Sequence, residues 1–239
     1  MAKPLRIAVV GSGAIGIYYG GKLAAAGRDV HFLMRGHLAR VRRDGFRGLC
    51  FICLSRTSRT TVERYDYGHI TIGEFGRPPQ PRTHAIASEF NRSGIKCEVV
   101  ENLVLERLRK LVWNIPFNSL SILAGGIDTA AIIGDENLRR VTLALMNEVI
   151  DAANKCGYAL ERGPANQQME RTMTMGAYKP STLLDFEARK ALEIEAIWGE
   201  PLRLATAAGA VLPRLEMIYS LLKTLDQTMG RASKSEHHL

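Results

Sequence analysis

Residues 5–36 read LRIAVVGSGAIGIYYGGKLAAAGRDVHFLMRG, and this stretch decides the fold of the N-terminal part of the chain. Residues 5–10 are almost continuously apolar, which is typical of a parallel strand covered on both faces. A glycine turn follows, then a helix that ends near residue 26 with Gly27 as its stop, and then a second strand over residues 30–34. This order predicts a βαβ unit of the Rossmann type.

The glycine turn predicts a dinucleotide site. Gly11 allows a sharp turn out of the strand, Gly13 lets the backbone approach a pyrophosphate, and Gly16 lets the helix pack closely on the sheet. Phosphates would then bind the free N–H groups of the helix N-terminus. The alternative is a structural turn without a ligand. The residues expected to bind the cofactor are Gly11, Ser12, Gly13, Ala14, Ile15 and Gly16.

The residue at the end of the second strand indicates which dinucleotide binds. Arg35 stands where an NAD-binding unit carries a carboxylate for the ribose 2′-hydroxyl. A guanidinium can instead bind a 2′-phosphate through charge-assisted hydrogen bonds, worth about 1.5–3 kcal/mol. The sequence therefore favours NADP (NADPH), with a solvated surface arginine as the alternative.

Length and composition are those of an ordinary globular protein. The chain has 239 residues, of which 46% are hydrophobic, enough for one full core or two modest ones. No apolar run approaches the roughly 18 residues of a membrane span. The N-terminus leads directly into the first strand rather than into a signal peptide, so we expect a cytoplasmic protein.

The four cysteines do not resemble a disulfide framework. Cys50, Cys53, Cys97 and Cys156 are few and scattered. Cys50 and Cys53 form a C-x-x-C pair inside a strand-like run, but no second pair and no histidine cluster accompanies it. Buried free thiols are therefore favoured over a redox or zinc site, and no metal is expected.

The formal net charge of +8 is concentrated in the first part of the chain. Up to residue 70 there are 12 Lys and Arg against 4 Asp and Glu, whereas the remainder carries 20 of each. No nucleic-acid motif and no pattern of aromatic residues for base stacking accompanies this excess. A phosphorylated dinucleotide and a solvated face account for the charge better than a nucleic-acid partner.

The rest of the chain divides into a strand-rich and a helical part. Hydrophobic patterning predicts an α/β, Rossmann-like part over residues 1–100 and an all-α part over residues 101–239. The predicted strands are residues 49–54, 61–63, 69–74 and 95–100, with one helix over 83–91. The predicted C-terminal helices are residues 101–123, interrupted or kinked at Pro116, then 137–156, 183–197, 201–208 and 213–229.

Three polar residues recur at helical spacing in the first of these C-terminal helices. Lys110, Asn114 and Asn118 lie at positions i, i+4 and i+8, which places them along one side of the helix. One cation and two amides would thus face the same space. The alternative is a polar stripe that faces water on a helical bundle.

Three segments together resemble one enzyme family. GSGAIG with FLMRG, then KLVWNIPFN, then ALEIEAIWGEP occur in the order found in the ketopantoate reductase family, 2-dehydropantoate 2-reductase. The resemblance implies that residues 1–100 form a shortened, NADP-binding Rossmann-like domain and that residues 101–239 form an all-α substrate and catalytic domain, with a substrate cleft between them. It also implies the reduction of 2-dehydropantoate to (R)-pantoate by NADPH, in pantothenate and coenzyme A biosynthesis.

The same resemblance assigns roles to residues of the helical part. Lys110 matches the family's catalytic lysine, and Glu193 matches a glutamate near the substrate and the nicotinamide ribose. Asn114, Asn118 and Ser181 match substrate-binding positions. The chemistry agrees, because hydride addition to a 2-keto acid builds negative charge on the carbonyl oxygen that a cationic proton donor can stabilise. Without the resemblance, Glu193 would be interpreted as a solvated helix carboxylate.

One departure from the family lies in the N-terminal part. Only residues 35–67 stand between the second strand and the family-like segment GHITIGEFG, where relatives carry several more strands and helices. The family's strand-end lysine and its Asn-Gly turn at the nicotinamide are missing, since no Asn-Gly pair occurs in the chain. A sheet that lacks its central strands has an exposed edge strand, which can pair with a strand of another chain. We therefore expect a homodimer.

Three functions stay open from the sequence. The first is an NADPH-dependent reductase of a small 2-keto acid. The second is a catalytically impaired, nucleotide-binding paralogue with a regulatory or assembly role, as the missing cofactor turn suggests. The third is a basic nucleic-acid-binding module.

Overall fold

The structure of the chain is a computed structural model that describes residues 6–10, 14–33, 46–56 and 62–235. The chain divides into two compact units, residues 1–106 and 107–239. The sequence-based domain prediction places its boundary after residue 100. Each unit is described by itself below.

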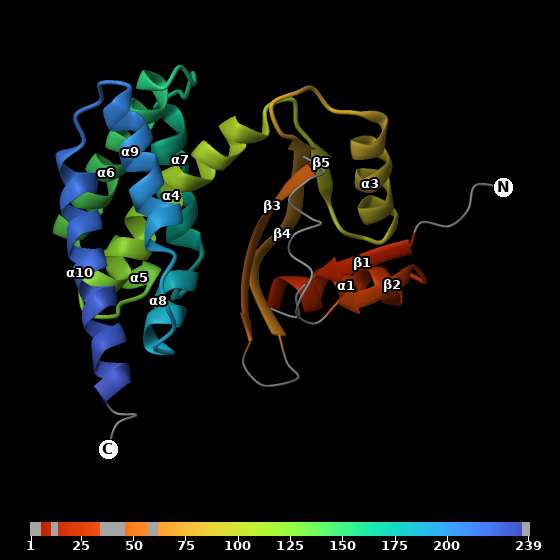
Figure 1. Ribbon diagram of the computed structural model, residues 1–239, viewed down its shortest axis with the longest axis horizontal. Helices are drawn as coiled ribbons and strands as arrows, with labels where there is room; N and C mark the ends of the chain where they lie inside the picture. Colours follow the sequence, from red (N-terminus) through yellow and green to blue (C-terminus); the bar gives the residue numbers. More distant parts are fainter. Residues whose placement is uncertain (1–5, 11–13, 34–45, 57–61, 236–239) are drawn as a thin grey trace. The chain divides into compact units, whose positions relative to one another are not determined.

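The N-terminal unit begins with a βαβ unit. Strand β1 (Arg6–Val10) and strand β2 (Asp29–Leu33) pair in parallel, with Arg6 opposite Asp29 and Val10 opposite Leu33. Helix α1 (Ala14–Ala25) connects them, and Gly27 follows it with φ +74°, a left-handed conformation that glycine adopts without steric cost. The predicted order of strand, helix, glycine stop and strand is confirmed (Figure 1).

The second sheet of this unit has the order β3-β4-β5. Strands β3 (Phe46–Arg56) and β4 (Val62–Glu74) form an antiparallel hairpin, and β5 (Cys97–Val99) pairs with β4 in parallel through the crossover helix α3 (Pro81–Arg92). The predicted separate strands 61–63 and 69–74 are therefore one strand. Within the described residues, no strand pairing joins this sheet to β1 and β2.

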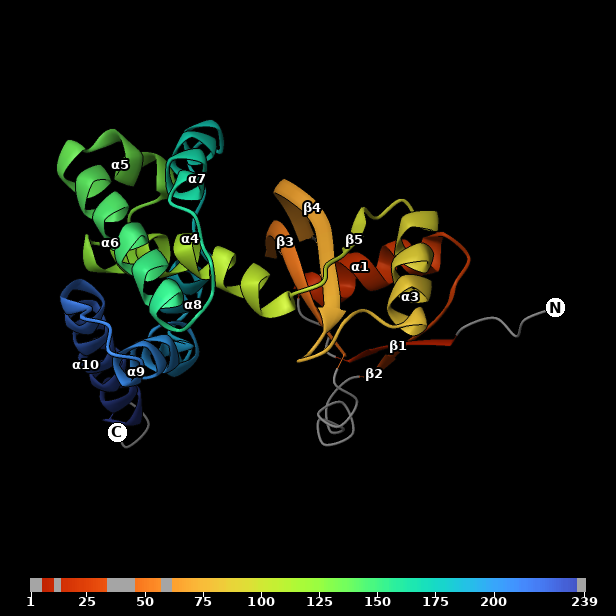
Figure 2. The same ribbon diagram turned by 90° about the horizontal axis from the view of Figure 1, so that it is seen from above.

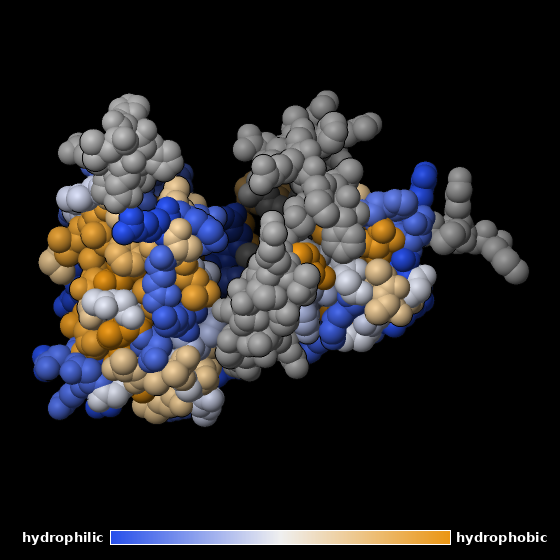
Figure 3. Space-filling model, turned by 90° about the horizontal axis from the view of Figure 1, so that it is seen from below, coloured by the Kyte–Doolittle hydropathy of each residue, from blue (hydrophilic) through white to orange (hydrophobic). Residues whose placement is uncertain are grey.

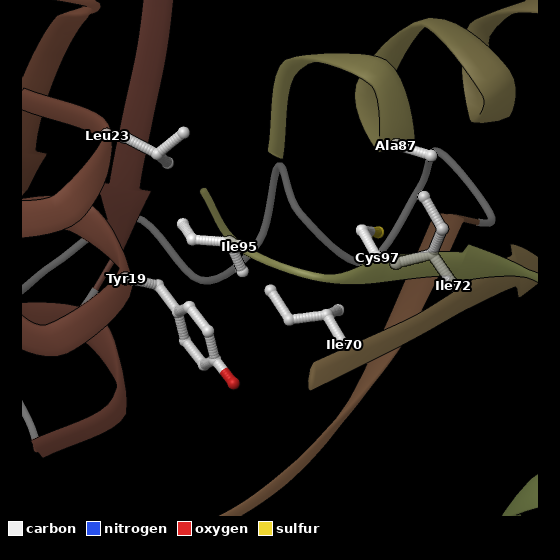
Figure 4. Packing of buried hydrophobic residues seen from close by; sticks show 7 residues of the cluster. All are labelled: Tyr19, Leu23, Ile70, Ile72, Ala87, Ile95 and Cys97. Atoms are coloured by element: carbon white, nitrogen blue, oxygen red, sulfur yellow. The ribbon is translucent and has the colours of Figure 1, made fainter. Parts of the chain in front are cut away.

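A single apolar cluster joins α1, α3 and the second sheet. Tyr19 and Leu23 of α1 meet Ile70 and Ile72 of β4, and the remaining buried members are Ala87, Ile95 and Cys97 (Figure 4). Partly buried Ile7 of β1 and Val30 of β2 pack against this cluster. Side-chain packing therefore joins the two sheets into one unit, although no strand pairing connects them among the residues that the structure describes.

The C-terminal unit is entirely helical over its described residues. Helix α4 lies in its middle in both ribbon views, and residues 115–122 of this helix are buried without interruption (Figures 1 and 2). The helices are α4 (Leu103–Leu123), α5 (Thr129–Gly134), α6 (Glu136–Lys155), α7 (Gly163–Thr174), α8 (Ser181–Glu187), the π-helical turn η1 (Glu195–Gly199), α9 (Glu200–Ala207) and α10 (Pro213–Ser235).

The predicted helix over residues 183–197 is wrong. Helix α8 ends at Glu187, and Arg189 then adopts φ 51°, a conformation that cannot continue a right-handed helix. Helical structure returns only near residue 194 and passes into η1. Helices α5 and α7 were not predicted, because short helices with weak apolar patterns give little signal in the sequence. The predicted fold class, a shortened α/β Rossmann-like part followed by an all-α part, is confirmed.

The surface of the helical unit is mixed in character. In Figure 3 its visible face carries apolar areas interspersed with charged ones. Among the apolar side chains, Met217 and Leu221 of α10 are 58% and 50% exposed. None of the helices in the described part of the chain has the length and apolarity that crossing a bilayer requires.

Candidate active site

Helix α4 carries the three polar residues predicted to share one side. The helix is continuous from Leu103 to Leu123, so Lys110, Asn114 and Asn118 follow one another at intervals of about one turn. Lys110 and Asn114 are half-buried, whereas Asn118 is only 1% exposed. The cation and the first amide therefore lie nearer the surface than the second amide.

Both polar atoms of the Asn118 amide are engaged within the protein. Its Nδ2 donates to the backbone oxygen of Asn114 at 2.9 Å, and its Oδ1 accepts the backbone N–H of Thr182 at 3.1 Å. Thr182 is the second residue of α8, where backbone N–H groups have no partner inside the helix. Asn118 thus joins α4 to the turn that begins with Ser181. Its predicted role as a substrate ligand stays a prediction.

Pro116 does not interrupt α4, so of the predicted interruption or kink the interruption is wrong, and the kink stays a prediction. Proline lacks the N–H that would bond to the carbonyl four residues earlier. That carbonyl belongs to Val112. The next turn carries additional bonds, because Ser119 Oγ donates to the backbone oxygens of Ile115 at 2.6 Å and Pro116 at 2.9 Å. Ile115 also accepts from the indole Nε1 of Trp198 at 3.2 Å. The helix continues through the proline within this set of extra bonds.

Ser181 and Glu193 lie at two element boundaries. Ser181 is the exposed first residue of α8. Glu193 is exposed and precedes η1, and its backbone oxygen accepts the N–H of Ile197 at 3.1 Å. Glu193 also lines a pocket of about 370 Å³, together with Leu192, Ile194, Glu195, Ala196, Lys223, Asp226 and Gln227. Lys110 and Ser181 are not among these lining residues, so their convergence with Glu193 stays a prediction.

The pocket next to Glu193 carries fixed charges. The Glu195 carboxylate accepts from Arg203 Nη1 at 2.6 Å and from Tyr219 Oη at 2.8 Å, and it pairs with Lys223 Nζ at 3.2 Å. Hydrogen bonding by Arg203, followed by Tyr219 and Lys223, lowers the pKa of Glu195 to about 2. The pKa of Lys223 is raised by its bonds to Tyr219 and Glu195. Both groups are therefore charged at neutral pH.

The predicted cofactor turn is described only in part. Gly11, Ser12 and Gly13 lie outside the described residues, and so does Arg35. Ala14, Ile15 and Gly16 form the first turn of α1, directly beyond the carboxyl end of β1. This is the place where a βαβ unit presents its helix N-terminus to phosphate.

The described cysteines are thiols without disulfide bonds. Cys50, Cys97 and Cys156 are free, and the Cys53 side chain is outside the described set. Burial, followed by the neighbouring Cys50 and Glu98, raises the pKa of Cys97 to about 11. A thiol with a raised pKa is a poor nucleophile at neutral pH. In the described residues, His, Cys, Asp and Glu nowhere gather in groups of three or more that could hold a metal ion.

Sequence reasoning missed Trp198 as a site-associated residue. It is 0% exposed and bonds to a helix 83 positions earlier in the chain. The only signal in the sequence was a tryptophan five residues after Glu193, in the segment that carries the family resemblance. A buried tryptophan usually finds a partner for its N–H, but spacing alone does not say which partner.

Comparisons with known proteins agree on one family. The sequence model described as "Ketopantoate reductase PanE/ApbA C terminal" matches residues 102–226, more than half of the chain. The model "Ketopantoate reductase PanE/ApbA" matches residues 7–48. The 2-dehydropantoate 2-reductase of Nostoc sp. is 27% identical over 304 aligned positions, which cover 92% of this chain and 95% of the relative.

Solved structures give the same result. The crystal structure of 2-dehydropantoate 2-reductase from Geobacter metallireducens has a TM-score of 0.86 at 28% identity, covering 92% of this chain and 100% of that one. D-mandelate dehydrogenase in complex with NADH has a TM-score of 0.79 at 15% identity, covering 94% and 99% respectively, and therefore shares the fold.

The alignment with the Nostoc protein is longer than this chain. It spans 304 positions, but this chain has 239 residues, so at least 65 positions, the difference between the two, are occupied by the Nostoc protein alone. Since the alignment covers nearly the full length of both chains, most of these positions are internal. The N-terminal family match ends at residue 48, within the region where the sequence departs from its relatives. With both parts of the family matched in order, the chain belongs to the ketopantoate reductase PanE/ApbA family.

Proposed function

We propose that this protein reduces 2-dehydropantoate, or a related 2-keto acid, to the corresponding 2-hydroxy acid with NADPH. The observation that carries the proposal is the side of α4 with Lys110 and Asn114, in the part of the chain that matches the family's C-terminal model. The Nostoc and Geobacter relatives are named 2-dehydropantoate 2-reductases, which supports the substrate class. Pantothenate biosynthesis is the route in which this reaction belongs.

The βαβ unit fits the phosphate end of a dinucleotide. The first turn of α1 begins at Ala14, after the carboxyl end of β1, and its first N–H groups have no acceptor within the helix. Gly11 and Gly13 in the preceding turn leave room for a pyrophosphate. Arg35 favours the 2′-phosphate of NADPH over the bare ribose of NADH. When bound, the nicotinamide supplies the hydride.

The protein's part in the reaction is to position the keto acid and to deliver a proton. Lys110, as an ammonium, stabilises the negative charge that grows on the carbonyl oxygen and donates the proton that completes the hydroxyl group. Glu193 orients the lysine and binds hydroxyl groups. Asn114 and Ser181 hold the substrate at near-attack geometry, an effect that can supply several kcal/mol of the rate enhancement.

Missing positions in the N-terminal part favour a second candidate function. In the described part of the chain β1 and β2 pair only with each other, and at least 65 aligned positions of the Nostoc relative have no counterpart. A protein that keeps a phosphate-binding turn but lacks the family's nicotinamide turn would bind a nucleotide without turnover. That protein would be a regulatory or assembly paralogue.

One assay separates these candidates. The full chain is mixed with NADPH, and binding is followed by nicotinamide fluorescence before and after 2-dehydropantoate is added. Binding followed by substrate-dependent oxidation supports the reductase. Binding without oxidation, over a panel of 2-keto acids, supports the paralogue. If the protein does not bind NADPH but slows the migration of DNA or RNA in a gel, both candidates are wrong and the protein is a nucleic-acid-binding module.

A further inference from the structure

Trp198 connects the segment of Glu193 to the helix of Lys110. Its side chain is fully buried, and its indole N–H donates to the backbone oxygen of Ile115 at 3.2 Å. Ile115 lies on α4, five residues after Lys110, or about 7.5 Å along the helix axis. Trp198 belongs to η1, the turn that Glu193 begins through its bond to the Ile197 N–H. One hydrogen bond therefore fixes the distance between two elements that carry proposed site residues.

The turn η1 is also held from its other side. Glu195 is bound by Arg203, Tyr219 and Lys223. At Gly199, an added Cβ would clash with the Glu195 carboxylate and lie 2.9 Å from Cε2 of Tyr219, so the turn packs closely against α10. Single π-helical turns are rare and occur frequently at functional sites. With anchors on both sides, η1 has little freedom to move along α4.

The acceptor of the Trp198 bond is equally constrained. Ile115 precedes Pro116, and its carbonyl also accepts from Ser119 Oγ at 2.6 Å. Ile115 and Phe117 are both 0% exposed, so this part of α4 is enclosed by its neighbours. A buried donor and a buried acceptor that satisfy one another leave no room for water to replace the bond without loss of packing.

We propose that Trp198 is a positioning residue for the reaction, setting the place of Glu193 relative to Lys110 through the indole bond to Ile115. This rests on the proposed function, in which Glu193 and Lys110 act on the same substrate. Trp198 itself touches neither substrate nor cofactor. Its contribution lies in holding η1 at one position along α4.

Trp198→Phe tests the bond while keeping an aromatic ring in the buried site. We expect kcat to fall about 10- to 100-fold, the size of effect that misplacement by about 1 Å produces. KM for the keto acid is expected to stay within about twofold, because the substrate contacts of α4 and α8 are unchanged. A rise in KM with unchanged kcat, or no kinetic change, overturns the proposal.

Trp113→Phe is the matched control. Trp113 is the only other tryptophan in the chain, it lies on the same helix, and its indole N–H donates to Thr172 Oγ1 of α7 at 3.0 Å. The Trp113→Phe variant thus loses an indole hydrogen bond of similar length to that of Trp198, but the lost partner lies on α7, which carries no proposed site residue. We expect kcat to remain near wild type. An equal fall of kcat in both variants would show a general packing effect and overturn the specific role of Trp198.

A double-mutant cycle with Glu193→Gln adds a measurement that general destabilisation would not reproduce. If Trp198 acts through Glu193, Trp198→Phe should reduce kcat little further in the Glu193→Gln background. Losses that multiply would mean that Trp198 acts independently of Glu193 and overturn the proposal. Should Trp198→Phe fail to fold, Gly199→Ala disturbs the same turn from the α10 side and should give the same loss of kcat at constant KM.

Failure of the proposed function is a separate outcome. If the wild-type chain turns over no 2-keto acid, the reductase proposal fails, and the placement of η1 is judged by amide hydrogen exchange in the full chain. Faster exchange over residues 194–199 in Trp198→Phe, with α6 unchanged, supports the anchoring role. Unchanged exchange over those residues overturns it.

Discussion

The side-chain carbonyl of Asn118 accepts a hydrogen bond from the backbone N–H of Thr182 at 3.1 Å, although the two residues lie 64 positions apart in the sequence. The bond supplies a partner from α4 to an N–H at the start of α8 that the helix itself cannot satisfy. Both residues are buried, at 1% and 4% exposure, so water cannot take the place of the asparagine. The start of α8, where Ser181 stands, is therefore fixed by a residue of the lysine helix.

Asn118→Leu should destabilise the protein by about 1–3 kcal/mol, because it leaves a buried N–H without an acceptor. The measurement is the free energy of unfolding from urea denaturation. Asn147→Leu is the control, because the Asn147 side chain bonds only within its own helix, to the Leu143 oxygen at 3.0 Å among the bonds described. Equal losses in the two variants would contradict a role for the link between α4 and α8.

Lys110→Ala should lower kcat by about 10² to 10⁴, the range for removing a positioned general acid, while the affinity for NADPH changes little. Steady-state kinetics and cofactor titration measure the two effects separately. Lys155→Ala, at the exposed C-terminal end of α6, removes the same charge and is expected to keep full turnover. Wild-type kcat in the Lys110 variant would reassign this lysine to a solvated helix face.

Arg35→Asp should weaken NADPH binding by roughly tenfold or more and NADH binding much less, since only NADPH carries the 2′-phosphate. The dissociation constants are measured by nicotinamide fluorescence. Arg40→Asp makes the same change of net charge five residues later and should not discriminate between the two cofactors. Equal losses for NADPH and NADH in the Arg35 variant would remove the basis for NADP preference.

Glu74 should make stability depend on acid pH. Its buried carboxylate accepts from Arg82 at 2.7 and 2.8 Å, from Thr83 at 2.8 Å and from Arg77 at 3.1 and 3.3 Å. These bonds, with Arg82 first, lower its pKa from 4.5 to about 2 despite the opposing effect of burial. The stabilisation is therefore complete above the unfolded-state pKa of about 4.5 and is lost as the pH falls toward 2.

Glu74→Gln tests this dependence through urea unfolding at a series of pH values from 7 to 2. The stability difference from wild type should be constant above about pH 4.5 and should shrink below it, since both proteins then carry a neutral side chain at this position. Thr83→Val removes one bond to the carboxylate but leaves both arginines, so most of the pH dependence should remain. An unchanged pH profile in Glu74→Gln would assign the acid sensitivity to other groups.

The sequence predicted the elements that depend on residues close together in the chain, and it failed where an element depends on a distant partner. Strand, glycine stop and strand follow from local rules, and so does the extent of α4, although local rules did not predict that this helix runs uninterrupted past Pro116. The same rules joined residues 183–197 into one helix, since nothing local marks Arg189 as left-handed. The segment after α8 is set by a distant partner, the Asp226 carboxylate, which accepts the Leu192 N–H at 3.2 Å.

The candidate site shows the same division. The spacing of Lys110, Asn114 and Asn118 fixes their common side, because a helix has one period. Spacing cannot reveal that the Asn118 side chain accepts the Thr182 N–H, or that the Trp198 indole donates to the Ile115 carbonyl. Both hydrogen bonds depend on how separate helices pack. The roles of Ser181 and Glu193 came from the family resemblance and from no local pattern.

The position of α4 in the chain has a consequence during synthesis. Its four described side-chain hydrogen bonds to later elements span 59, 59, 64 and 83 positions, to Gln168, Thr172, Thr182 and Trp198. At translation rates of about 5–20 residues per second, Ile115 is added to the chain roughly 4 to 17 seconds before Trp198. Until Trp198 is made, the buried backbone oxygen of Ile115 lacks the indole donor. The lysine helix therefore acquires its full set of described contacts only after most of the chain has been synthesised.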